Sequence, residues 1–228
     1  LWWDDWTILA AVILCYGSIA HAVVGINLGL GIPYAYAHIQ DFLKGGLVYF
    51  CLYIVTLATI KFSVLLMYYR IFKVASFKLA VIIVSSIVAV WAIIAFFFTL
   101  FECTPVSDFW SLDVSKTHCI DRLMLFDATA ASNTILDIMI LSLPVPMVLK
   151  LQLSLSKRIQ LLLTFMLGTF VCIISIIRLV AVVTQDVHNI SPTTEEVADY
   201  IWTTTETYVA VISACLPTYR PFVTNTSG

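Results

Sequence analysis

Apolar residues along this chain fall into six long stretches, which polar, glycine or proline residues separate. About 20 apolar residues are enough for a helix to cross the hydrocarbon core of a bilayer. We therefore predict membrane-spanning helices over residues 6–29, 46–72, 79–102, 123–149, 159–184 and 198–223. The connections between these stretches are short, which favours a single domain over residues 1–228. The expected fold is an all-α, polytopic transmembrane helix bundle.

The composition also indicates a protein embedded in a lipid bilayer. Hydrophobic residues make up 61% of the chain and charged residues only 11%, well outside the usual balance of a soluble domain. We expect a multi-pass integral protein of the plasma membrane or the endoplasmic reticulum. The net charge of −2 comes without a Lys/Arg cluster, so nucleic acid is not an expected partner. The spacing of Cys and His residues predicts no metal site.

Basic residues set the expected orientation of the bundle. One side of the predicted bundle carries seven Lys and Arg residues and the opposite side carries three. Basic residues in short loops stay in the cytoplasm, so the richer side is expected to be cytoplasmic. That side holds Arg70, Lys73, Lys78, Lys150, Lys157, Arg158 and Arg220, and the outer side holds Lys44, Lys116 and Arg122.

The chain begins with LWWDDW rather than with Met. We expect a further segment to precede this stretch in the full protein. Asp4 and Asp5 then lie at the cytoplasmic start of the first predicted helix. Carboxylates there accept hydrogen bonds from free N–H groups and interact favourably with the helix dipole. Both residues are predicted to cap this helix.

The loop FECTPVSDFWSLDVSKTHCIDR falls on the outer side of the predicted bundle. An oxidising compartment allows cysteines to pair there, and Cys103 and Cys119 both lie in this loop. We expect a disulfide between them. Two free thiols are the alternative.

Five ionisable residues lie within the predicted spans, namely Lys61, Asp127, Asp137, Arg178 and Glu206. Each should face the bundle interior and find a partner, because a charge is costly in hydrocarbon. At 1.5 Å of rise per residue, Lys61 and Asp137 each lie about 22 Å from the outer end of their helix. We predict an ion pair between them. Asn133 lies one turn from Asp137 and can hydrogen-bond it, so this layer is expected to be structural.

The other three charged residues are expected to form a second layer nearer the outer surface. Asp127 lies about 6 Å, Arg178 about 9 Å and Glu206 about 12 Å from the outer ends of their helices. One cation with two carboxylates leaves a negative charge, a bound proton or a place for a cationic ligand. Asp127 or Glu206 is then a candidate acid, and Arg178 a candidate stabiliser of developing charge. Structural pairing, with Asp127 simply hydrated, is the alternative.

Aromatic residues gather near the outer ends of the predicted helices. Tyr49, Tyr53 and Trp202, together with Asn133, are candidate ligand-binding residues above the charged layer. Tyrosine and tryptophan also anchor helices at the membrane interface, and that alternative stays open. Near the cytoplasmic end of the fourth span, Pro144 predicts a kink or an unwound turn, because proline removes a backbone donor.

These motifs together resemble the fungal rhodopsin-domain family of integral membrane proteins. The resemblance rests on DDWTILAA, YIVTLATIKFSVLLMYYRIF, FECTPVSDFW, NTILDIMILSLPVPMVLKLQLS, LGTFVCIISIIRLV and ETYVAVISACLPTYRPF, which together extend over essentially the whole chain. The family's motif positions fall on Asp4, Asp5, Lys61, Arg70, Cys103, Cys119, Asn133, Asp137, Arg178 and Glu206. The resemblance implies a seven-helix, receptor-like protein whose first helix precedes the given chain. Opsins hold retinal through a lysine in their last helix, but residues 198–223 contain no lysine, so we expect no retinal and no other cofactor.

Three functions remain open from the sequence. The first is a receptor-like protein that binds a lipophilic small molecule among the aromatic residues of the outer half. The second is a cofactor-free membrane enzyme, an isomerase or cyclase, that uses a buried carboxylic acid on a lipophilic secondary metabolite. The third, a proton-coupled transporter, ranks last because the sequence shows no inverted repeat. The sequence indicates no particular protein partner.

Overall fold

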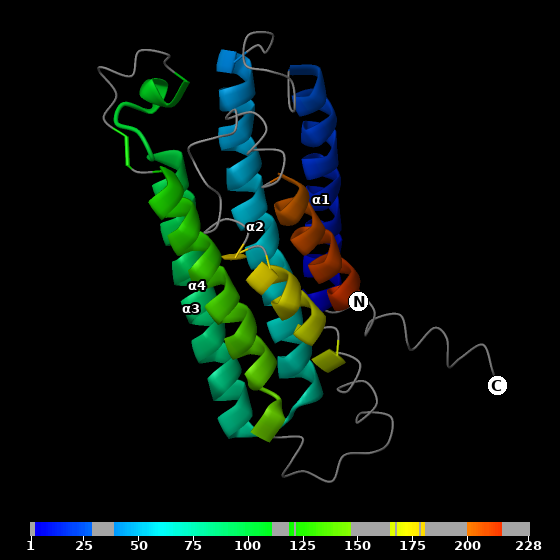
Figure 1. Ribbon diagram of the computed structural model, residues 1–228. Coiled ribbons are helices and arrows are strands. Elements are labelled where there is room, and N and C mark those ends of the chain that lie inside the picture. Colours follow the sequence, from blue (N-terminus) through cyan, green and yellow to red (C-terminus); the bar gives the residue numbers. More distant parts are fainter. Residues whose placement is uncertain are drawn as a thin grey trace, which may run out of the picture.

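The computed structural model describes residues 3–28, 39–110, 119–120, 122–146, 165–166, 168–177, 179–180 and 200–215. Its long elements are α1 (Trp3–Leu28), α2 (Ile39–Ile71), α3 (Ala75–Leu100) and α4 (Arg122–Ser142). Residues 168–177 and 200–215 are also helical, and Figure 1 shows them in yellow and orange-red beside α2. The expected all-α helical membrane bundle is confirmed.

Four of the described helices are long and apolar enough to cross a membrane, and they correspond to the first four predicted spans. They cover Trp3–Asn27, Gln40–Ile71, Ala75–Leu100 and Met124–Ser142. Gly168–Ile177 forms a shorter apolar helix within the fifth predicted span. Large apolar side chains such as Ile82 and Phe97 are exposed on α3. Such residues are stable in a lipid bilayer, where hydrocarbon surrounds them.

Helix α2 begins at Ile39, earlier than residue 46, where the apolar stretch starts. Its first turns contain Asp41 and Lys44, which form an ion pair of 3.4 Å across one turn. The Lys44 ammonium also lies 5.8 Å from the ring centroid of Trp110, in the short 3₁₀ helix η2 (Val106–Trp110). The helix therefore begins several residues before the apolar stretch, because i,i+3 charge pairs support helical structure in water.

Helix α4 ends as its proline content predicts. The regular helix stops at Ser142, Leu143 and Pro144 form a turn, and Val145 and Pro146 are helical again. The missing N–H of proline interrupts the hydrogen-bond ladder at this point. The predicted interruption near the end of this helix is confirmed.

Helix α2 occupies the centre of the described bundle, and both α1 and α3 pack against it. On one side, its Leu65 and Tyr68 belong to an apolar cluster with Val88 of α3 and Leu136 of α4. On another side, Ile60 packs with residues of α1 and of the helix 200–215. The buried polar residues Thr56 and Lys61 of α2 therefore face other helices rather than lipid.

The disulfide between Cys103 and Cys119 is present, as predicted. It lies beside a backbone hydrogen bond of 2.9 Å from the N–H of Ile120 to the carbonyl of Glu102. Together these bonds tie the loop after α3 to the segment that leads into α4.

Asp4 connects the start of α1 to the end of α2. Its carboxylate lies 3.2 Å from the Arg70 guanidinium, and its carbonyl accepts a hydrogen bond of 3.2 Å from Ser63. Asp4 and Asp5 both lie in the first turn of α1, where negative charge is favourable. The side chain of Asp4 therefore joins two helices, and capping of α1 by Asp4 and Asp5 stays a prediction.

Candidate functional site

An ion pair between α2 and α4 lies at the centre of the candidate site. The Lys61 ammonium of α2 contacts Oδ1 of Asp137 of α4, and the two side chains are only 5% and 13% exposed. A lysine or aspartate in hydrocarbon is costly, and pairing with the opposite charge lowers that cost. The ion pair predicted from helix depth is therefore present in the structure.

Glu206 lies in the same network, although helix depth placed it in a separate outer layer. Its carboxylate is 1% exposed and accepts a hydrogen bond of 2.6 Å from the Tyr53 hydroxyl. Asn133 donates to its other oxygen at 2.9 Å. Tyr53 comes from α2 and Asn133 from α4, so Glu206 joins the helix 200–215 to both.

Ser175 and Asn133 connect the carboxylates of Asp137 and Glu206. The Ser175 hydroxyl lies 2.6 Å from Oε1 of Glu206 and 3.1 Å from Oδ2 of Asp137. The Asn133 amide nitrogen lies 3.4 Å from that same Asp137 oxygen. Glu206, expected in the outer layer, is thus joined to the deeper layer. Asn133 lies one turn, about 5.4 Å, nearer the start of α4 than Asp137, so its side chain bridges part of the depth that separates the two carboxylates.

We call Lys61, Asp137, Asn133, Ser175 and Glu206 the polar network. Its members come from α2, α4 and the helices 168–177 and 200–215. Ser175 was not predicted as a site residue from the sequence. It is the only polar residue in the run VCIISII, and that isolation is the signal that could have indicated it.

Asp127 lies apart from the polar network in this structure. Its Oδ1 atom is buried and has no hydrogen-bond partner among the described residues. Arg178, its expected partner, lies outside those residues. The expected roles of Asp127 as an acid and of Arg178 as a charge stabiliser stay predictions.

The half of the bundle that holds the end of α1 contains an aromatic cluster of His21, Tyr49 and Tyr200. The rings of Tyr49 and Tyr200 stack with their centroids 3.8 Å apart, and His21 stacks on Tyr49 at 5.6 Å. The Nδ1 atom of His21 contacts the Tyr200 hydroxyl, and Tyr49 hydrogen-bonds Thr204 at 2.9 Å. These rings pack against one another, whereas the sequence suggested that Tyr49 lines a pocket. His21, a lone histidine in the first apolar stretch, was not predicted as a site residue from the sequence.

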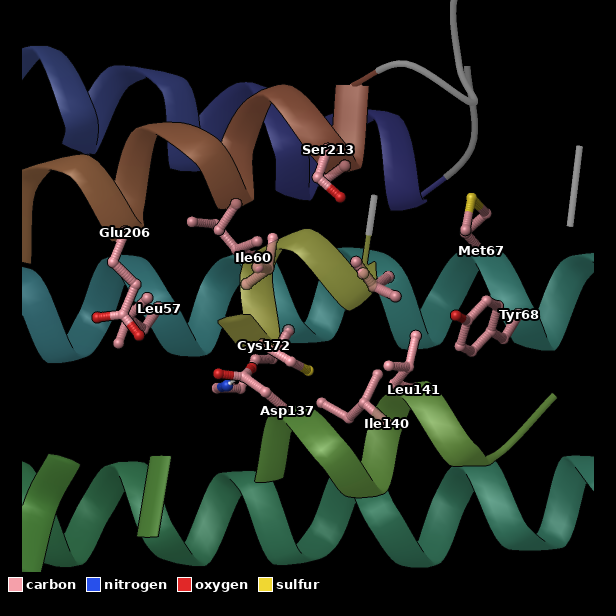
Figure 2. A pocket seen from close by; sticks show the side chains of 16 residues that line it. Leu57, Ile60, Met67, Tyr68, Asp137, Ile140, Leu141, Cys172, Glu206 and Ser213 are labelled. Atoms are coloured by element: carbon pink, nitrogen blue, oxygen red, sulfur yellow. Dashed lines mark hydrogen bonds and ion pairs between the residues drawn. The ribbon is translucent and has the colours of Figure 1, made fainter. Parts of the chain in front are cut away.

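A cavity of about 70 Å³ adjoins the polar network and is lined by Lys61, Asp137 and Glu206. Figure 2 shows Glu206 and Asp137 towards one end of its lining and Tyr68 towards the other. Apart from Lys61 and a few polar groups, the walls are apolar and include Ile60. One water needs about 10–15 Å³ of such volume, so the cavity can hold several waters or a small chemical group.

The arrangement provides several chemical groups at one end of an apolar cavity. Lys61 supplies an ammonium donor, and Asp137 and Glu206 supply carboxylate acceptors. Hydrogen bonds and charge attraction are strong in such a setting, because little water competes with them. Among the residues that the structure describes, no three His, Cys, Asp or Glu side chains are grouped to hold a metal ion. The site can therefore orient a polar group or exchange a proton with it.

Fold and site define a multi-pass helical membrane protein with a buried polar centre. The family model of the fungal rhodopsin domain matches residues 1–225. The chain belongs to this family, which confirms the resemblance seen in its motifs. No solved structure matches the chain.

Three curated relatives illustrate the family. The polyenoic acids biosynthesis gene cluster protein Ba17b of Metarhizium anisopliae is 29% identical over 96% of this chain and 64% of its own length. The satratoxin biosynthesis SC1 cluster protein 4 of Stachybotrys chartarum is 30% identical over 71% of this chain and 58% of its own length. A SAT4 family membrane protein of Emericella nidulans is 32% identical over 71% of this chain and 41% of its own length. The chain thus spans less than two thirds of each relative.

Proposed function

We propose that this protein, as a receptor-like membrane protein, binds a lipophilic small molecule whose polar group enters the cavity beside the polar network. The supporting observation is an apolar cavity with Lys61, Asp137 and Glu206 in its lining. Binding sites for small molecules commonly combine apolar walls with a few polar groups that fix orientation. In this proposal a hydroxyl, amine or carboxyl group of the ligand contacts the polar network, and its apolar part extends out of the cavity past α2 and the helix 200–215.

The names of two relatives support this ligand class. They associate one relative with the biosynthesis of polyenoic acids and the other with that of satratoxin. Polyenoic acids are lipophilic molecules with one polar group, which suits an apolar cavity that has charged groups at one end. We therefore propose a secondary metabolite, or an intermediate on the way to one, as the ligand.

This proposal places the ligand deeper than the outer half favoured by the sequence. Tyr53 contributes through its hydrogen bond of 2.6 Å to Glu206. Tyr49 and Tyr200 stack at 3.8 Å in the outer half and would have to separate to admit a ligand from outside. Trp202, half-buried in the same part of the bundle, is not among the residues that line the cavity.

A cofactor-free isomerase or cyclase is the second candidate function. The observation that favours it is the Ser175 hydroxyl, which lies within 3.1 Å of a carboxylate oxygen on either side. In an isomerisation, one carboxylic acid would donate a proton to the substrate while the other carboxylate removes one. Ser175 would then pass a proton between them, so that both groups return to their starting states.

One experiment distinguishes the two functions. Cells that express the intact full-length protein, the Glu206→Gln variant, the Asp127→Asn variant or an empty vector are fed a panel of lipophilic pathway intermediates. Untargeted mass spectrometry then follows small molecules in the cells and those that co-purify with the protein. A metabolite that co-purifies unchanged with intact protein and Asp127→Asn, but not with Glu206→Gln, supports ligand binding at this site. A new product with the same dependence supports the enzyme.

Two cavity variants make the location testable. Ala210→Leu adds bulk to the cavity wall, whereas Ile212→Leu changes a side chain that is 57% exposed on the same helix. The proposal expects loss of the metabolite with Ala210→Leu and retention with Ile212→Leu. Equal retention by both variants would exclude this cavity as the site.

A further inference from the structure

A second hollow lies on the outside of the bundle, between α2 and α3. It is a groove of about 440 Å³, lined by Phe62, Leu66, Tyr69, Val81, Ile82, Ser85, Ser86 and Ala89. None of these residues belongs to the polar network or lines its cavity. The groove is therefore separate from the site of the proposed function.

The groove exists because small side chains face large ones. Ser85 and Ala89 are one turn apart on α3 and leave space beside Phe62 and Tyr69 of α2. The groove extends from Phe62 to Tyr69, about 10 Å along the helix axis at 1.5 Å per residue. That is about a third of the 30 Å hydrocarbon core. The groove is therefore long enough for the first part of a lipid acyl chain.

Positive charge lies at one end of this groove. The Lys78 ammonium is 4.7 Å from the ring centroid of Tyr69, so it is held directly beside a groove-lining residue by a cation–π contact. Lys73 is exposed in the turn between α2 and α3. The distribution of basic residues places this end on the cytoplasmic side, where anionic phospholipids are concentrated.

We propose that this groove holds an anionic phospholipid of the inner leaflet. One acyl chain lies between α2 and α3 against the rings of Phe62 and Tyr69, and the phosphate group contacts the Lys78 ammonium. Charge complementarity identifies the occupant, because the apolar groove leads directly to a fixed lysine at the depth of the lipid head groups. A neutral phospholipid would occupy the same groove more weakly.

Native mass spectrometry of the intact full-length protein in detergent tests this proposal. The probes are phosphatidylserine and phosphatidylcholine with identical acyl chains, added in turn. One lysine near an anionic surface contributes about 1 kcal/mol, which is about fivefold in affinity. We expect Lys78→Gln to weaken phosphatidylserine binding about fivefold and to leave phosphatidylcholine binding unchanged. Lys78→Arg, which keeps the charge, should retain the preference.

Two further variants separate charge from groove shape. Lys44→Gln removes a lysine that also lies over an aromatic ring, but at the opposite end of α2, and should bind both lipids as the unmodified protein does. Ser85→Leu adds bulk to the groove and should lower binding of both lipids. Helical circular dichroism checks that each variant is folded. If Lys78→Gln behaves like Lys44→Gln, or if Ser85→Leu binds both lipids normally, the proposal is wrong.

Discussion

Replacing Asp137 by asparagine should be among the most damaging single changes in the membrane interior. It leaves the Lys61 ammonium, 5% exposed, without its carboxylate partner. Removing one member of a buried ion pair typically costs about 3–5 kcal/mol. For a protein of this size, 1 kcal/mol corresponds to about 2–4 °C in melting temperature. We therefore expect the midpoint of thermal unfolding to fall by about 6–20 °C in detergent micelles.

A double-mutant cycle shows how much of this loss belongs to the ion pair. Lys61→Met combined with Asp137→Leu replaces both charged groups by apolar ones, which is often neutral or even stabilising. The double variant should regain most of the stability lost by Asp137→Asn. Asp137 also contacts Ser175, so Ser175→Ala serves as the control for a lost hydrogen bond and should cost about 1 kcal/mol.

The assay is thermal unfolding followed by circular dichroism at 222 nm, with each variant in the same detergent. Two results would refute the reasoning. The first is a melting temperature of Asp137→Asn within about 1 °C of the unmodified protein, which would mean that Lys61 needs no partner. The second is a double variant whose loss of stability equals the sum of the losses of Lys61→Met and Asp137→Leu measured singly, because the effects of uncoupled residues add.

Two further predictions concern single contacts. A Cβ at Gly45 would lie 2.9 Å from Nε2 of His21, so Gly45→Ala should destabilise the protein by about 1–3 kcal/mol. A Cβ at Gly46 meets nothing within 4 Å, so Gly46→Ala should be neutral or stabilising. Equal melting temperatures of the two variants would contradict this prediction. Breaking the Cys103–Cys119 disulfide, with its sequence separation of 16, should cost about 3 kcal/mol. Alkylation of the denatured chain should label fewer cysteines before reduction than after it, and equal labelling would show that the bond is absent.

The bundle was largely predictable because one physical requirement dominates it. A backbone in hydrocarbon must satisfy its own hydrogen bonds, so long apolar stretches become helices, and the first four agree with the structure. The start of α2 at Ile39 was not predictable in this way. Polar side chains such as Asp41 and Lys44 extend that helix beyond its apolar stretch.

The candidate site was predictable only in part. The pairing of Lys61 with Asp137 followed from the cost of burying charge and from equal depth. Glu206 was assigned to another layer because depth along an axis ignores the reach and direction of its side chain, which contacts Asn133 at 2.9 Å. Ser175 carries no charge, so its cost in hydrocarbon was too small to indicate a role. The cavity depends on how side chains pack across helices, which the order of residues does not specify.

The ion pair between Lys61 and Asp137 also has a consequence for biogenesis, because the two residues are 76 positions apart in the chain. At about 5–20 residues per second of synthesis, Lys61 leaves the ribosome about 4–15 s before Asp137 does. A lysine at the centre of an inserting helix costs about 2.5–3.5 kcal/mol. The apolar residues of α2 must offset this cost alone until α4, which carries Asp137, has been synthesised and inserted. Additional polar substitutions in α2 should therefore lower the amount of protein that reaches the membrane before they affect the folded bundle.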